Sequence, residues 1–79
     1  MTTTNKGVTP KVGGTYRVYG KMGDMKRFMA MSGSEFTDKL IFAEVFHIDS
    51  EDKLEKFNRE LKYLNTQGTF EARRIPKSV

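Results

Sequence analysis

The chain has 79 residues and a net charge of +4, with 14 Lys and Arg against 10 Asp and Glu, and it contains no cysteine. A chain of this length forms one small domain that buries only about 60% of its unfolded surface, which leaves no room for a deep cofactor cavity. The lack of cysteine excludes a disulfide framework, thiolate catalysis and cysteine-ligated zinc.

The termini are polar. No apolar run approaches the roughly 20 residues of a transmembrane helix, and residues 1–6 lack the hydrophobic core of a signal peptide. We therefore expect a cytoplasmic protein without a membrane partner. Residues 1–14, rich in threonine and glycine, predict a flexible N-terminal tail, and residues 76–79 predict a C-terminal tail. The folded domain is expected to span residues 15–75.

The first half of this domain predicts a hairpin. Side chains over residues 15–21 alternate between two faces, which is typical of a strand. Glycine and aspartate in residues 22–24 predict a turn, and residues 25–31 predict a second strand. So short a connection favours an antiparallel pair. Serine and glycine in residues 32–35 then predict a loop.

Residues 39–47 contain the most hydrophobic run of the chain, rich in β-branched and aromatic types, and they predict a third strand. Both faces of this strand are apolar, because Leu40 and Phe42 are left on the outer side when the odd-numbered residues turn inward. This surplus of apolar surface requires a partner, such as the N-terminal tail, a second copy of the chain or a ligand.

Residues 49–64 predict an amphipathic helix. Either Asp49 or Ser50 can cap it, because both side chains accept hydrogen bonds from the amides of the first turn. The apolar positions recur every three or four residues, so they share one face of the helix. These positions are Leu54, Phe57, Leu61 and Leu64.

Residues 69–75 predict a last strand, which Pro76 ends because proline cannot donate a ladder hydrogen bond. The sequence thus predicts an α+β fold in the order β-β-β-α-β, with a small antiparallel sheet packed against one helix. The predicted core consists of Tyr16, Val18, Phe28, Ile41, Ala43, Val45, Leu54, Phe57, Leu61, Leu64 and Phe70.

Positive charge is concentrated in the predicted hairpin and the last strand. If these strands are neighbours, their cations gather into a patch that suits the phosphates of DNA or RNA. The predicted phosphate contacts are Arg17, Lys26, Arg27, Arg73 and Arg74, with Tyr19 as a base contact. Arg and Lys are also the usual solvent-facing residues of strands, so a merely solvated sheet face stays open as an alternative.

A second function class is a protein-interaction or inhibitor domain, in which Leu40, Phe42 and a free sheet edge contact another protein or a second copy of the chain. Catalysis is not expected, because the sequence contains no nucleophile elbow, phosphate loop or paired-carboxylate pattern. With His47 as the single histidine, neither a metal site nor a cofactor is expected.

A resemblance to known proteins rests on four short runs: Tyr16-Arg17-Val18-Tyr19, Lys26-Arg27-Phe28, residues 40–46 and Phe70-Glu71-Ala72-Arg73. These runs resemble a group of short proteins without an assigned activity that are carried by phages and mobile elements of gut bacteria. The order of three strands and a helix, with its Tyr-Arg-Val opening, is also similar to the arm-site DNA-binding module of tyrosine recombinases. That similarity implies that DNA is the partner and that the sheet reads it.

Overall fold

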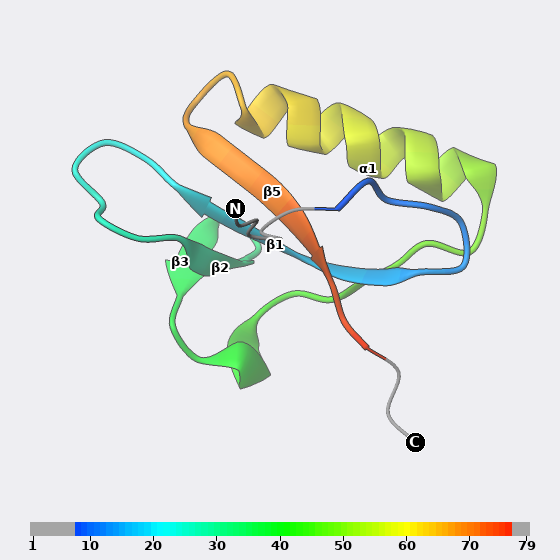
Figure 1. Ribbon diagram of the computed structural model, residues 1–79, viewed down its shortest axis with the longest axis horizontal. Helices are drawn as coiled ribbons and strands as arrows, with labels where there is room; N and C mark the ends of the chain where they lie inside the picture. The colour runs from blue at the N-terminus through cyan, green and yellow to red at the C-terminus, as the bar shows by residue number, and fades with distance from the viewer. Residues whose placement is uncertain (1–7, 77–79) are drawn as a thin grey trace, which may run out of the picture.

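The computed structural model describes residues 8–76, which form a five-stranded antiparallel sheet with one α-helix against it (Figure 1). The elements are β1 (Thr15–Lys21), β2 (Met29–Ser32), β3 (Glu35–Thr37), the 3-10 turn η1 (Leu40–Phe42), β4 (Phe46–His47), α1 (Glu51–Leu64) and β5 (Thr69–Arg74). The predicted α+β class, with a small antiparallel sheet packed against one helix, is confirmed.

Strand β1 lies at the centre of the sheet. β5 pairs with it along one edge, from Tyr16 to Lys21. The other edge is shared by two short strands, because β4 pairs at Thr15 and Tyr16 while β2 pairs at Tyr19 and Gly20. β3 then pairs with the far side of β2. Side chains of β1 therefore alternate between an inner face, which packs against α1, and an outer face on the opposite side.

The core lies between the inner face and α1. Phe57 is the buried residue of the helix, and its ring centroid lies 6.0 Å from that of Tyr16 and 5.0 Å from that of Phe46. The buried cluster is Tyr16, Val18, Met31, Ile48, Phe57, Phe70 and Ala72, with Phe36, Phe46, Leu54, Leu61 and Leu64 packed against it. The apolar stripe of the helix thus points at the sheet, as its spacing predicts.

Close packing between β1 and β5 depends on Gly20. This glycine pairs with Phe70, whose ring covers the position that a Cβ atom would occupy. We expect Gly20→Ala to destabilise the fold by about 1–3 kcal/mol, because the added methyl group overpacks the core. Urea denaturation measures this change in the free energy of unfolding.

A double-mutant cycle tests the cause of that destabilisation. If the clash with Phe70 is responsible, Gly20→Ala costs less in a chain that also carries Phe70→Leu, because leucine lacks the ring. An equal cost in both backgrounds would show that the Phe70 ring is not what excludes alanine.

The helix begins at its cap as predicted. The Ser50 side chain accepts a hydrogen bond from the Lys53 amide at 3.3 Å, and Glu51 and Asp52 place negative charge in the first turn. Asp49 precedes the cap and forms an ion pair with Lys53 at 3.2 Å. At the other end, the Asn65 amide donates to the Leu61 carbonyl.

The predicted third strand over residues 39–47 is wrong. Its first part forms η1, and only Phe46–His47 pairs with β1. The missed strand β3 occupies the far edge of β2, so the chain crosses from there to the start of β1 before it pairs again as β4. The Glu44 amide donates to the Met31 carbonyl at 3.0 Å along this crossing. Topology therefore overrides the β-propensity of the segment.

The predicted second strand begins late, because residues 25–28 belong to a loop and β2 starts at Met29. Three residues that were predicted to lie in the core lie outside it. Ile41 and Val45 are exposed along the crossing segment, and Phe28 is half-buried beside cations of the outer face. Met31 and Ile48 contribute to the core in their place.

Residues 8–14 pack against the domain, in contrast to the predicted flexible tail. The Val8 amide donates to the Ala72 carbonyl at 3.0 Å, on the edge of β5 away from β1. The Lys11 amide donates to Tyr16 Oη at 2.9 Å, and Pro10 is buried. Residues 1–7 and 77–79 of the two predicted tails lie outside the described residues.

Candidate functional site

The outer face of β1 and β5 carries cations and aromatic rings in close contact. In the antiparallel register Arg17 pairs with Arg73, and Tyr19 pairs with Glu71, so these side chains share one face. Lys21 and Phe28 complete the group. We name it the cationic cluster: Arg17, Tyr19, Lys21, Phe28, Glu71 and Arg73.

Arg73 is the best-anchored cation of the cluster. Its guanidinium carbon lies 4.2 Å from the centroid of the Tyr19 ring and 5.7 Å from that of Phe28. Its Nε donates to Glu71 Oε2 at 2.7 Å. These contacts fix the orientation of the guanidinium group, because cation–π attraction and the ion pair both act on it.

Arg17 lacks such compensation. It lies directly opposite Arg73 in the ladder, and like charges in that position destabilise a sheet. Its Nε is buried and has no hydrogen-bond partner in the part of the chain that the structure describes. Over residues 8–76 no carboxylate lies within ion-pair distance of Arg17. An anion between the two arginines would relieve their repulsion.

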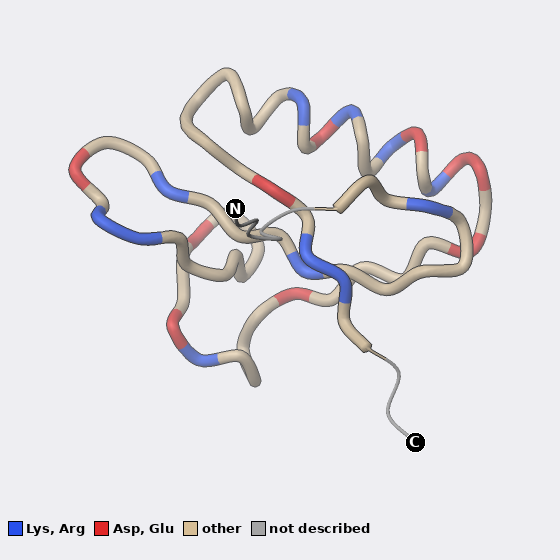
Figure 2. The backbone as a smooth tube through the Cα atoms, in the orientation of Figure 1, with Lys and Arg blue, Asp and Glu red and all other residues tan. Residues whose placement is uncertain are grey.

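The other predicted contacts are separated from this pair. Lys26 and Arg27 are exposed on the loop between β1 and β2, and Figure 2 shows the cations of this loop away from those where β1 and β5 cross. Arg74 pairs with Tyr16, so it lies on the side of the sheet that faces the helix. The structure therefore brings Arg17, Tyr19 and Arg73 together and excludes Arg74 from their face.

Three members of the cationic cluster were missing from the predicted site: Lys21, Phe28 and Glu71. Lys21 Nζ lies 5.5 Å from the centroid of the Phe28 ring. The alternation of β1 already places Lys21 on the same face as Arg17 and Tyr19, so its position was available in the sequence. The position of Phe28 could not be predicted from the sequence, because it depends on the conformation of the long loop before β2.

A second exposed surface is the turn η1. Leu40, Ile41 and Phe42 are 50%, 84% and 60% exposed, and we name these three residues the apolar ridge. Leu40 and Phe42 are thus exposed as expected, although on a 3-10 turn rather than on the outer side of a strand. Acidic residues Asp38 and Glu44 flank the ridge.

Among residues 8–76, no three side chains of the metal-ligating types His, Asp or Glu gather into a group able to hold a metal ion. The single described helix is also too short and too polar to cross a membrane.

Comparison of the chain with protein-family models, with curated proteins and with solved structures gives no match. The resemblance to phage and mobile-element proteins and to the arm-site module therefore stays a prediction.

Proposed function

We propose that this chain is a nucleic-acid-binding module that holds backbone phosphates on the outer face of β1 and β5. The observation that carries the proposal is the direct pairing of Arg17 with Arg73, with Arg17 Nε buried and unsatisfied among the described residues. A phosphate accepts hydrogen bonds from both guanidinium groups and neutralises their repulsion. Arginine forks match the geometry of phosphate oxygens better than lysine does.

The aromatic rings have a supporting part in this proposal. One face of the Tyr19 ring is covered by Arg73 at 4.2 Å, so the ring orients that guanidinium group. This replaces the predicted base contact by Tyr19 with a positioning role. Lys21, Lys26 and Arg27 extend the positive surface along the hairpin, and the net charge of +4 favours encounter with a polyanion.

The proposal is a binding function without catalysis, in the cytoplasm, where nucleic acid is accessible. The protein-interaction alternative depends on a different surface, the apolar ridge.

Salt dependence tests the proposed function. Affinity for short duplex DNA and RNA oligonucleotides, measured by fluorescence anisotropy, is expected to fall linearly on a double-logarithmic plot against salt concentration. If Arg17, Lys21 and Arg73 each contact one phosphate of B-DNA, the slope is about −2.7. Affinity then falls roughly 40-fold between about 50 and 200 mM salt. Absence of binding at the lowest salt would contradict the proposal.

A further inference from the structure

Phe28 is an aromatic residue of the outer face that lies outside the core. It is half-buried, with Lys21 Nζ at 5.5 Å and the Arg73 guanidinium carbon at 5.7 Å from its ring centroid. Both distances are near the limit of about 6 Å for a cation–π contact, whereas the same guanidinium carbon lies 4.2 Å from the centroid of the Tyr19 ring. The cations therefore cover the Phe28 ring less closely, and its remaining apolar area gains from a flat partner.

The strand register places this ring beside the proposed phosphate contacts. Gly20 pairs with Met29, so Lys21 and Phe28 are the next positions where the two chains leave the ladder. Arg17 and Lys21 are about 13 Å apart along β1, at roughly 3.3 Å per residue. A nucleic-acid strand that follows β1 from the arginine pair to Lys21 therefore passes the Phe28 ring.

A base stacks on such a ring only when it is unpaired. In a duplex each base is held between its neighbours in the stack, and its edge is occupied by the partner base. In a single strand the bases turn out readily, and aromatic side chains beside a cationic groove serve as platforms for them. Phosphate contacts at the arginine pair and a ring further along β1 thus match a single strand better than a duplex.

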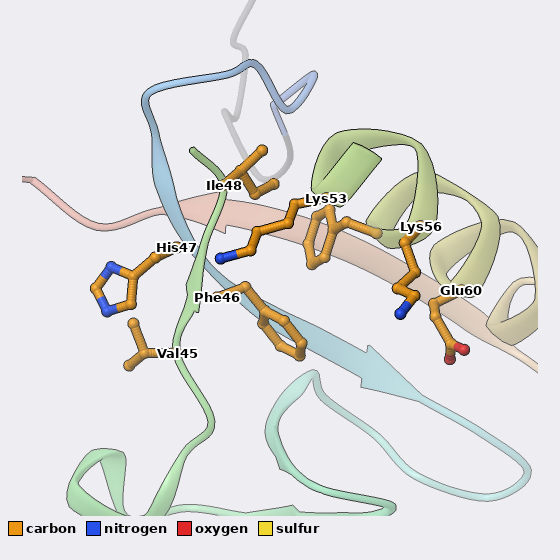
Figure 3. Close-up of a pocket in the computed structure, with 8 residues that line it drawn as sticks. Val45, Phe46, His47, Ile48, Lys53, Lys56 and Glu60 are labelled. Atoms are coloured by element: carbon orange, nitrogen blue, oxygen red, sulfur yellow. The ribbon is translucent and has the colours of Figure 1, made fainter. Parts of the chain in front are cut away.

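The opposite side of the sheet does not offer the same combination. Lys53 and Lys56 project from α1 at a cavity of about 260 Å³ beside Phe46 (Figure 3). Glu60 lines this cavity too, and Lys53 is already paired with Asp49 at 3.2 Å. The Phe46 ring packs against the core. Because the acids there repel phosphates, the outer face is the better track for a polyanion.

We infer that the preferred ligand is single-stranded nucleic acid, with one base stacked on Phe28 while Arg17 and Arg73 hold a backbone phosphate. This inference rests on the proposed function and adds the class of nucleic acid to it. Duplex DNA also presents phosphates to the two arginines, so it is expected to bind, but more weakly than a single strand.

Three oligonucleotides separate stacking from charge. Oligothymidine and oligouridine are compared by fluorescence anisotropy at low salt with an abasic strand, which has the same length and charge but no bases. One stacked base is expected to give at least about five-fold tighter binding than the abasic strand. The tighter of the two base-carrying strands identifies the sugar that the site prefers. A duplex of the same length is expected to displace oligothymidine only at a higher concentration.

The outcomes distinguish this inference from the proposed function. Equal affinity for the abasic and the base-carrying strands overturns the inference but leaves the proposed function standing, since phosphates alone then account for binding. Displacement of oligothymidine by an equal or lower concentration of duplex has the same meaning. If none of these ligands binds at low salt, the inference and the proposed function both fail.

A tryptophan reporter locates the stacked base. The chain contains no tryptophan, so Phe28→Trp introduces a single indole fluorophore at the proposed platform. Saturating oligothymidine is expected to quench its emission, because a base then covers the ring, whereas the abasic strand leaves the emission nearly unchanged. Equal quenching by both strands, or no quenching by oligothymidine, overturns the inference.

Phe28→Leu tests the natural ring, since leucine keeps an apolar side chain but has no aromatic face. This variant is expected to lose most of the preference for oligothymidine over the abasic strand. The matched control is Phe42→Leu, the same change at a phenylalanine of the apolar ridge that is 60% exposed, and it is expected to keep the preference. Circular dichroism checks that both variants stay folded. A Phe28→Leu chain that retains the full preference overturns the inference.

Discussion

Replacing Phe57 by alanine is expected to destabilise the fold by about 3–5 kcal/mol, because it deletes a buried ring and leaves a cavity that the core fills only in part. Phe57 is 6% exposed and contacts both Tyr16 and Phe46. A domain of this size has a total stability of roughly 4–12 kcal/mol, so this substitution is expected to remove a large share of it. Urea denaturation followed by circular dichroism measures the loss.

The matched control for this prediction is Tyr63→Ala on the same helix. Tyr63 is 62% exposed, so removing its ring is expected to change stability by no more than about 0.5 kcal/mol. If both substitutions cost the same, the loss reflects a general weakening of the helix, and the assignment of Phe57 as the centre of the core is wrong.

Replacing Arg17 and Arg73 together by glutamine is expected to give the largest loss of nucleic-acid affinity. Each substitution removes one phosphate contact, so the salt slope is expected to become shallower by about 1 per arginine, or about 2 for the pair. Glutamine keeps a polar side chain of similar reach, which limits the change in packing. Fluorescence anisotropy at a series of salt concentrations measures both the affinity and the slope.

A second double variant is the control for the effect of net charge alone. Arg59→Gln with Lys62→Gln removes two exposed cations from α1 and lowers the net charge equally, from +4 to +2. This control is expected to retain most of the affinity and an almost unchanged slope. If the two double variants weaken binding equally, the protein binds through its overall charge, and the cationic cluster is not the site.

The helix was predictable because its signals are local. The Ser50 cap, the acidic first turn and the three- and four-residue spacing from Leu54 to Leu64 all depend on residues close together in the chain. Strand β1 was predictable for the same reason, since its alternation is complete over Thr15–Lys21.

The crossing segment was not predictable from local pattern. Residues 39–47 have the composition of a central strand, yet only Phe46–His47 pair with β1, because β3 already occupies the far edge of β2. Which segments pair depends on where the other strands lie, and the β-propensity of a local run of residues gives no information about that. The exposed apolar ridge is a consequence, because side chains suited to a strand remain on an unpaired turn.

The candidate site was predictable in part. Alternation alone placed Arg17 and Tyr19 on one face, and adjacent residues such as Arg73 and Arg74 cannot share a face of a strand. Since Phe70 was predicted in the core, the same alternation already placed Arg74 on the helix side. The direct pairing of Arg17 with Arg73 required the register between β1 and β5, which only the structure provides.

An NMR titration of ¹⁵N-labelled protein with a short DNA duplex at low salt tests directly whether the outer face binds nucleic acid. We expect the largest shift changes on amides of β1 and β5 around Arg17, Tyr19 and Arg73, and on the loop that carries Lys26 and Arg27. Changes confined to α1 or to the apolar ridge, or no changes at all, would contradict it.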